Sequence, residues 1–414
     1  MPAVRSHCRV FNPLGWWQEE DPEKAGRRLL VIGCGPSGIQ ILRQLWKDFE
    51  VTLVEPKDYY EFTPGILRGL CHPQHLETLL LPLEDALAGM RVNHIKGRVV
   101  RLSERSAQVD SPVHGLMAVD FDYAVVAVGS QYAGNSLWKV SGAAEADELS
   151  LIGRRKSLEA MRQNLEDLEK EQKTLVLLGA GLVGVELAAE VKHYFPTLRV
   201  VLADRSQTVL PVLPKDAQDY AQTWLKEHGV DLRLGCELPR DETALLKALE
   251  IDEAKVLLCA GLGFHAGMAA TLECVDASGQ ITTNRFMQCI DSKGHPSADG
   301  RIFALGDCVN VRGTEMRFTK DIYPAEAMAN VVVSNLRRLR NDPGSANLEE
   351  LSSRLQEITL CSLGPTDCIF VRNGGVVTTG WIAVQMKHQV EVTKMGEMRQ
   401  EMWGSFVWSL VPHW

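Results

Sequence analysis

The sequence predicts an α/β protein with two copies of a dinucleotide-binding unit and a small C-terminal α+β domain. Three observations carry this prediction. Two stretches of the chain each combine an apolar strand, three spaced glycines, a helix and a second strand that ends in an acid. In both units a later apolar run also closes on a glycine. The C-terminal part of the chain then alternates strand-like runs with turns.

The first unit begins with the apolar run Leu29–Ile32, which is long enough for a buried parallel strand. Three glycines follow in the spacing G-x-G-x-x-G, namely Gly33, Gly35 and Gly38. In this spacing the first glycine allows a tight turn, the second lets the backbone approach a pyrophosphate, and the third lets the next helix pack on the strand. The sequence therefore predicts a phosphate-binding turn directly after the strand.

A helix over Ile39–Lys47 and a strand over Val51–Val54 continue the first unit. The amino end of such a helix directs backbone N–H groups at a bound phosphate. Glu55 follows the strand about twenty residues after the first glycine, where a carboxylate can accept hydrogen bonds from a ribose. Strand, glycines, helix, strand and acid in this order are far more specific than the glycines alone, so we predict a dinucleotide site here.

Two later segments, each an apolar strand that ends in a glycine turn, are expected to belong to the same unit. The run Ala124–Ser130 is a buried strand that closes on a glycine, as parallel strands do where they approach a cofactor. The run Arg301–Cys308 is a short apolar strand that ends in Gly306 and Asp307. An aspartate at that position can bind the ribityl or pyrophosphate region of a flavin, while the alternative is an ordinary Gly-Asp turn.

The second unit repeats this pattern. The strand Thr174–Leu178 leads into three glycines, a helical run over Val185–His193, and the strand Arg199–Ala203, which ends in Asp204. The three glycines are Gly179, Gly181 and Gly184. The run Val256–Gly261 again closes on a glycine, so the duplication extends beyond the turn. Two such units predict two dinucleotides side by side, which implies electron transfer between them.

The acid of the second unit bears on the choice of nicotinamide. Asp204 would accept a hydrogen bond from a 2′-hydroxyl and repel a 2′-phosphate, which favours NADH. Arg205, directly beside it, would receive a phosphate, which leaves NADPH open.

Composition excludes several classes of function. The formal net charge of −9 argues against a general nucleic-acid surface. The ten cysteines form no C-x-x-C pair, so we expect neither a metal site nor a disulfide framework, and free thiols indicate a reducing compartment. Cys34 lies inside the first glycine turn, where a helix N-terminus can lower the pKa of a thiol, although a small core residue is the simpler interpretation.

The order of these segments predicts the domain organisation. We expect an N-terminal extension over 1–26, the first domain over 27–150, the second over 151–288, the rest of the first over 289–340, and a C-terminal domain over 341–414. In that last domain we expect strands over Ile358–Leu363, Ile369–Val371 and Val376–Val384.

The two ends of the chain leave the location open. The tail Met402–Trp414 is aromatic and apolar, which fits contact with a bilayer interface, docking on the protein's own surface, or a homodimer contact. The first eighteen residues contain Arg5 and Arg9 and no acid, which faintly resembles an organellar transit peptide, although a loose extension is the simpler interpretation. We expect a cytoplasmic protein, with membrane association and a mitochondrial location as alternatives.

Together these motifs resemble the two-dinucleotide-binding-domain flavoproteins of the pyridine nucleotide-disulfide oxidoreductase superfamily. Within it, the chain looks most like the branch of the ferroptosis suppressor protein, the apoptosis-inducing factor 2-like proteins and the type II NADH dehydrogenases. The resemblance runs from about Arg27 to Gln400 and rests on Val31–Gly38, Leu178–Glu190, Tyr194–Pro196, Ile302–Cys308 and Ala325–Asn335. It implies two Rossmann-like FAD- and NAD(P)-binding domains plus a small C-terminal α+β domain.

The resemblance also implies a set of site residues. FAD would contact Gly33, Gly35, Pro36, Ser37, Gly38, Glu55, Val99, Ala127, Gly129, Gly306 and Asp307. NAD(P)H would contact Gly179, Gly181, Leu182, Val183, Gly184, Glu186, Asp204 and Gly261. Hydride would pass from the nicotinamide to the flavin, and the flavin would reduce a quinone or another small acceptor. Lys320 matches a lysine beside the flavin in the suppressor branch, and it joins Glu326 as a predicted catalytic residue.

The chain departs from the resemblance at two places. Type II dehydrogenases carry an Ala-Gln-x-Ala-x-Gln-like element beside the quinone, where this chain has Glu326 and Asn330 in place of the glutamines. The disulfide reductases of the superfamily carry a cysteine pair, but Pro56–Leu70 has no cysteine and Cys71 stands alone. We therefore expect no dithiol mechanism. A second hypothesis of a different class is a flavoprotein redox sensor or scaffold in cell-death signalling, in which turnover is incidental.

Overall fold

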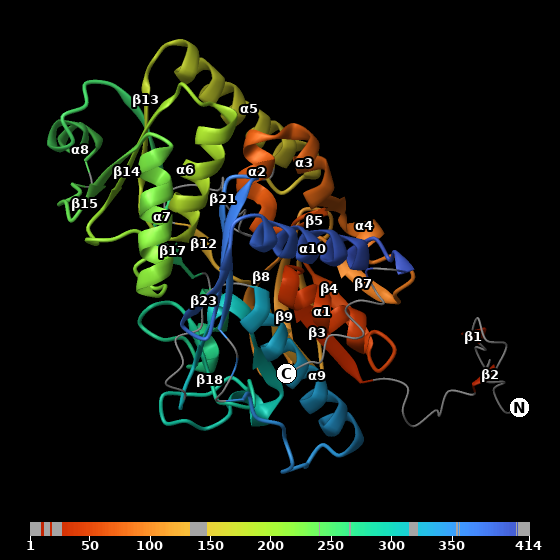
Figure 1. Ribbon diagram of the computed structural model, residues 1–414. Helices are drawn as coiled ribbons and strands as arrows, with labels where there is room; N and C mark the ends of the chain where they lie inside the picture. The colour runs from red at the N-terminus through yellow and green to blue at the C-terminus, as the bar shows by residue number, and fades with distance from the viewer. Residues whose placement is uncertain are drawn as a thin grey trace, which may run out of the picture.

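A computed structural model describes residues 10–11, 17–18, 27–132, 147–239, 241–264, 266–313, 322–352, 355, 357–402 and 404. Near the N-terminus, β1 (Val10–Phe11) and β2 (Trp17–Gln18) pair with each other in antiparallel fashion. The rest of the described chain forms two parallel-sheet units and a smaller C-terminal part (Figure 1).

The first unit is built on a five-stranded parallel sheet. Its strands, in spatial order, are β19 (Ile302–Ala304), β11 (Tyr123–Val126), β3 (Arg28–Ile32), β4 (Glu50–Val54) and β7 (Val92–Ile95). The helices α1 (Pro36–Leu45) and α9 (Ile322–Asn341) lie against each other, and the side-chain amide of Gln44 donates to Asn330 at 3.0 Å. Because β19 follows the whole second unit in sequence, the chain returns to complete the first sheet.

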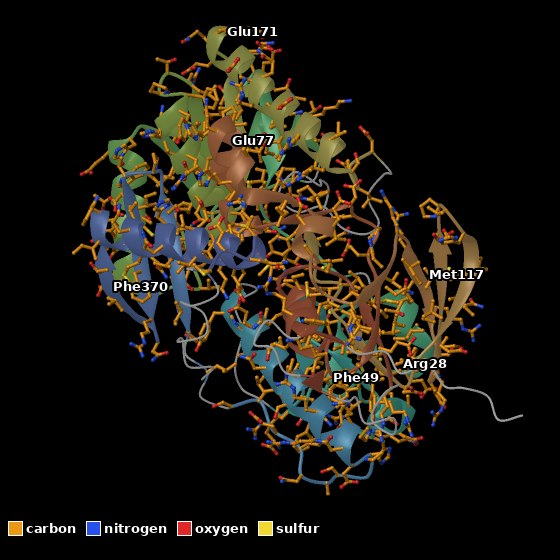
Figure 2. The ribbon with its side chains drawn as sticks, turned by 90° about the vertical axis from the view of Figure 1, so that its right-hand side faces the viewer. Arg28, Phe49, Glu77, Met117, Glu171 and Phe370 are labelled. Atoms are coloured by element: carbon orange, nitrogen blue, oxygen red, sulfur yellow. The ribbon has the colours of Figure 1, made fainter. Side chains whose placement is uncertain are left out.

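Smaller elements surround this sheet. The antiparallel strands β5 (Tyr59–Glu61) and β6 (Leu80–Pro82) enclose the turn η1 (Thr63–Gly65) and the helices α2 (Ile66–Cys71) and α3 (Pro73–Leu79), and α4 (Leu83–Ala86) follows. An antiparallel sheet of β8 (Arg98–Leu102), β9 (Ser106–Ser111) and β10 (Gly115–Asp120) forms one side of the molecule. Figure 2 shows Met117 of this sheet on the opposite side from Phe370, which lies in the C-terminal sheet.

The second unit follows α5 (Leu151–Lys170). Its parallel sheet has the order β15 (Val230–Leu234), β14 (Arg199–Asp204), β13 (Thr174–Leu178) and β16 (Ala254–Leu258). This order repeats β7-β4-β3-β11 of the first sheet, so both glycine turns follow equivalent strands. The helices are α6 (Leu182–Tyr194), α7 (Lys215–Glu227) and α8 (Glu242–Ala248).

Two connections join the units, and they are equivalent as well. Beyond β11 the chain enters β12 (Gln131–Tyr132), and beyond β16 it enters β17 (Leu262–Gly263). These two short strands pair with each other in antiparallel fashion. The chain then passes η2 (Gly267–Leu272), β18 (Ile281–Thr283) and η3 (Ser297–Gly300), and after β19 it enters η4 (Gly306–Cys308) and β20 (Val309–Val311), which pairs in parallel with β18.

The C-terminal part has an antiparallel sheet and one long helix. The strands are β21 (Ile358–Leu363), β22 (Asp367–Arg372) and β23 (Gly375–Thr379), and the helix is α10 (Trp381–Met398). The expected strand over Val376–Val384 is therefore wrong beyond Thr379. Gly380 takes a φ of +73°, which breaks the strand, and the helix begins directly after it. In the part of the chain that the structure describes, no helix has the length and apolar character needed to span a bilayer.

Candidate functional site

The two glycine turns share one geometry at their first glycine. Gly33 and Gly179 have φ values of +98° and +114°, a region that favours glycine. A Cβ on Gly33 would lie 2.5 Å from the carbonyl oxygen of Ala127, and one on Gly179 would lie 2.6 Å from the Cβ of Ala260. Both turns therefore require glycine for the backbone angle and for the close approach of the neighbouring strand.

The third glycine of each triad lets the helix pack against the turn. A Cβ on Gly38 would lie 2.0 Å from the carbonyl oxygen of Gly33, and one on Gly184 would lie 1.8 Å from that of Gly179. No side chain fits at either position, so α1 and α6 can lie directly on the turns that precede them.

The middle glycines face open space. Gly35 and Gly181 are the N-cap residues of α1 and α6, both with a φ of −75°, and a Cβ built on either has no protein atom within 4 Å. No side chain caps either helix, which leaves its first N–H groups for another acceptor. Each turn thus offers free donors, room for a ligand and the positive end of a helix dipole, which together suit a pyrophosphate.

The two acids are held by matching hydrogen bonds. Glu55 is buried and accepts from the backbone N–H of Cys34 at 2.6 Å and of Lys57 at 3.0 Å. Asp204 accepts from the N–H of Ala180 at 2.6 Å and of Ser206 at 2.7 Å. In both units the donors are the residue after the first glycine and the residue two places after the acid. Each carboxylate is therefore fixed at the mouth of its turn, with lone pairs left for a ribose.

The Gly-Asp pair that follows β19 lies at the first turn. Gly306 has a φ of +79°, and a Cβ on it would lie 2.7 Å from the hydroxyl of Ser37 at the start of α1. Asp307 accepts a hydrogen bond from the hydroxyl of Ser130 at 2.7 Å. Residues that are far apart in sequence thus meet at the amino end of α1.

The other residues predicted to bind cofactors fall into three groups. Ala127 lies against Gly33, and Gly129 and Gly261 take positive φ values of +68° and +83° after the equivalent strands β11 and β16. Pro36 is the first residue of α1, while Leu182 and Val183 begin α6 and are partly buried. Val99 is partly buried on β8 against the first core, one sheet away from the turn.

Glu186 bonds to the C-terminal part of the chain. One of its carboxylate oxygens accepts from the backbone N–H of Ser362 at 2.8 Å and from the ammonium of Lys387. Burial opposes the charge of Lys387, but the carboxylate of Glu186 raises its pKa overall. Sequence reasoning missed Lys387, because it lies on a helix that the sequence does not predict.

The two predicted catalytic residues have different outcomes. Lys320 lies outside the described residues, as do 1–9 and 405–414. Glu326 is on the first turns of α9, where it forms an ion pair with Lys394 of α10 at 2.6 Å. The ion pair of Lys394 could not be predicted from the sequence either, because its partner Glu326 lies on a different helix.

The cysteines in the described residues form no disulfide, and the side chains of Cys274 and Cys289 are hydrogen-bonded to each other. All of them are free, and all but Cys236 are buried. Burial, followed by the charge of Glu55, raises the pKa of Cys34. The idea that the helix N-terminus lowers this pKa is therefore wrong, and Cys34 is a neutral core residue. The described part of the chain also holds no group of three His, Cys, Asp or Glu residues that could bind a metal.

The known proteins that are similar to this chain include two relatives by sequence and one solved structure. A type II NADH:quinone oxidoreductase from Staphylococcus epidermidis is 23% identical over 380 residues, which cover 84% of this chain and 90% of the relative. Ferroptosis suppressor protein 1 from Homo sapiens is 25% identical over 339 residues, 76% of this chain and 83% of the relative. The solved structure of NDH2 from Plasmodium falciparum in complex with NADH covers 92% of this chain and 97% of its own, with a TM-score of 0.68 and 14% identity. That structural match shows a shared fold.

The family match covers both units. The pyridine nucleotide-disulphide oxidoreductase family matches residues 27–329, well over half of the chain. This stretch contains both glycine turns, both acids and the Gly-Asp pair after β19. The chain therefore belongs to the pyridine nucleotide-disulphide oxidoreductase family.

Proposed function

We propose that this protein is an FAD-dependent oxidoreductase that takes electrons from NAD(P)H and passes them to a quinone-type acceptor. The observation that carries the proposal is the pair of equivalent turns, each with open space over its middle glycine, uncapped helix N–H groups and a fixed acid. Two such turns, joined by paired connecting strands, suit two dinucleotides in one molecule.

The first unit is the proposed FAD site. The backbone N–H groups of Gly35 and Ser37 lie at the amino end of α1, beside the open space over Gly35, while Pro36 has no N–H to donate. Glu55 would accept a hydrogen bond from the ribose. Asp307, oriented by Ser130, adds a second carboxylate at this turn. When bound, a flavin supplies the redox chemistry, because it accepts a hydride and returns electrons to an acceptor.

The second unit is the proposed NAD(P)H site. Asp204 has both oxygens engaged by backbone N–H groups, so its charge is fixed where a ribose would lie. A fixed carboxylate accepts from a 2′-hydroxyl and repels a 2′-phosphate, which supports NADH as the preferred donor. The relative from Staphylococcus epidermidis, named as an NADH:quinone oxidoreductase, supports the same donor and a quinone acceptor.

Peripheral membrane contact is part of the proposal. The outward side of α10 exposes Trp381, Ile382, Met386 and Val390. Ile382, Met386 and Val390 are four residues apart, on the helix that precedes the aromatic tail. A lipid surface would cover them and bring a lipophilic quinone close to the protein. The homodimer and the cell-death scaffold remain hypotheses that no feature of the described residues favours.

The test is anaerobic. The purified protein should be yellow, should bleach on addition of NADH faster than with NADPH, and should be reoxidised by a ubiquinone analogue. Oxygen, ferricyanide and a disulfide serve as competing acceptors. A protein that binds no flavin after gentle purification and reconstitution would overturn the proposal, and a disulfide as the fastest acceptor would overturn the quinone assignment.

A further inference from the structure

Two buried thiols meet in the part of the chain between β17 and β19. The side chains of Cys274 and Cys289 are hydrogen-bonded to each other. Cys274 also donates to the carbonyl oxygen of Ala269 in η2 at 3.7 Å. Cys274 is 1% exposed and Cys289 is 0% exposed. Neither residue belongs to a glycine turn, and the proposed function uses neither of them.

The backbone of β18 holds the two segments that carry these thiols. The N–H of Thr282 donates to the carbonyl of Cys274 at 2.7 Å, and its carbonyl accepts from the N–H of Ile290 at 3.0 Å. Cys289 itself pairs with Thr283, the next residue of β18. Because the N–H and the carbonyl of one strand residue point to the same side, Cys274 and Cys289 lie end to end along one edge of β18. Their proximity is therefore fixed by the backbone.

The two thiols differ in how readily they ionise. The thiol of Cys289 donates to the sulfur of Cys274 and holds the pKa of Cys274 below its usual value, although burial opposes this. The same hydrogen bond, together with burial, raises the pKa of Cys289. Burial raises the pKa of the other core cysteines Cys34, Cys71, Cys259, Cys361 and Cys368. Since a thiolate is the nucleophile in thiol chemistry, Cys274 is the attacking thiol and Cys289 is the thiol in position to react with it.

We propose that Cys274 and Cys289 form a reversible disulfide when hydrogen peroxide oxidises the protein. The thiolate of Cys274 attacks one oxygen of the peroxide, the O–O bond breaks, and a sulfenic acid and hydroxide result. The sulfur of Cys289 then attacks the sulfenic sulfur, so that an S–S bond forms and the S–O bond breaks. The protons of both thiols end on the departing oxygens. Two thiols and one peroxide therefore give one disulfide and two waters.

The disulfide acts on the proposed flavin site, so this consequence rests on the proposed function. The side-chain amide of Gln280, between the two cysteines, donates to the carbonyls of Asp307 at 3.4 Å and Val309 at 2.8 Å. β18 also pairs with β20, directly after the turn that holds Asp307. The N–H of Cys289 donates to the carbonyl of Ile302 in β19 at 2.9 Å, which ties this end of the loop to the first sheet. Closing the loop restricts its local opening, so flavin should leave the oxidised protein more slowly.

A peptide map of the full-length protein tests the disulfide directly. After treatment with hydrogen peroxide and alkylation in denaturant, mass spectrometry should find Cys274 linked to Cys289, and dithiothreitol should remove the link. In Cys289→Ala the reaction should stop at the sulfenic acid of Cys274, which dimedone captures, whereas Cys274→Ala should give no capture at Cys289. The map of the wild-type protein needs neither variant, so it decides the question even if a variant fails to fold.

Cys361 and Cys368 provide the matched control. They lie on the paired strands β21 and β22, where Cys361 is opposite Ile369 and thus one position out of register with Cys368. Their side chains therefore point to opposite faces of the sheet, and they belong to different hydrophobic clusters. The two thiols should stay unlinked under the same treatment, and Cys361→Ala should leave the other link unchanged.

Flavin release gives the second readout. In mild urea the linked protein should lose flavin severalfold more slowly than the reduced protein, and dithiothreitol or Cys274→Ala should abolish the difference. A protein that keeps both thiols under peroxide, or that links Cys289 to Cys308, overturns the disulfide assignment. Equal flavin release from linked and reduced protein overturns the coupling to the cofactor site. A protein that forms the link but binds no flavin overturns the proposed function and supports the disulfide.

Discussion

At the scale of single residues, the glycine triads show how far local sequence determines structure. The tight turn and the helix contact predicted for the first and third glycines agree with the positive φ of Gly33 and the 2.0 Å separation at Gly38. The partners of these turns could not be predicted. Ser130 and Asp307 are 177 positions apart, and only the return of β19 to the first sheet brings them together.

The same geometry predicts opposite effects for neighbouring alanine substitutions. Gly38→Ala should destabilise the protein by about 1–3 kcal/mol or more, because its methyl group would overlap the backbone oxygen of Gly33. Gly35→Ala should leave the stability of flavin-free protein unchanged, because the backbone angle is ordinary and the space is open. It should nevertheless lower the flavin content after purification. Thermal unfolding of stripped protein and the flavin absorbance check both effects.

Gly181→Ala is the matched control in the second unit. Its backbone angle is the same and its space is equally open, so it should fold normally and keep its flavin. The KM for NADH should rise by on the order of tenfold, the cost of about one hydrogen-bond-sized contact. Full flavin content in Gly35→Ala, or loss of flavin in Gly181→Ala, would contradict the assignment of the two units.

At the scale of elements, α10 is the helix that the sequence pattern did not predict. The run Val376–Val384 is rich in β-branched residues and favours a strand, and the break depends on the single residue Gly380. The helix also inverts the usual pattern. Its inward positions include Lys387, Glu391 and Lys394, while its exposed side carries apolar residues. Charged side chains among the buried residues of α10, next to Ala383, Met395 and Met398, defeat a search for an amphipathic helix with a purely apolar core side.

The exposed apolar side of α10 predicts binding to lipid. The double variant Ile382→Gln/Met386→Gln removes two exposed apolar side chains and should reduce co-flotation with phospholipid vesicles at least severalfold, since each buried side chain is worth about 1.5–3 kcal/mol. Its melting temperature should not fall, because neither side chain is buried. Val212→Gln, an exposed apolar residue of the second unit, is the control and should float like wild type. Equal flotation of all three proteins would contradict membrane contact through α10.

At the scale of the whole molecule, the repeated unit could be predicted from the sequence, but the side-chain contacts that connect the two units could not. Each glycine turn, acid and strand is encoded within about thirty consecutive residues, the size of a βαβ unit. By contrast, Glu186 and Lys387 are 201 positions apart, and they meet because α10 reaches from the second unit to the first. At its other end the side-chain amide of Gln400 donates to the carbonyl of Ala88 beyond α4. The C-terminal helix therefore ties both units together.

Removing the ion pair between Lys387 and Glu186 tests whether α10 connects the two units. Lys387→Met leaves the carboxylate of Glu186 buried without its cation, so unfolding should become easier by about 3–5 kcal/mol, and Glu186→Gln/Lys387→Met should recover most of the loss. Because the folded-state pKa of Lys387 is raised above its usual 10.5, the pair stabilises fully at lower pH and loses its effect as pH rises through the folded value. Denaturant unfolding should thus show a constant gap between wild type and Lys387→Met from neutral pH to about 10.5, narrowing above it. A gap that widens at alkaline pH would mean that Lys387 is not charged in the folded protein.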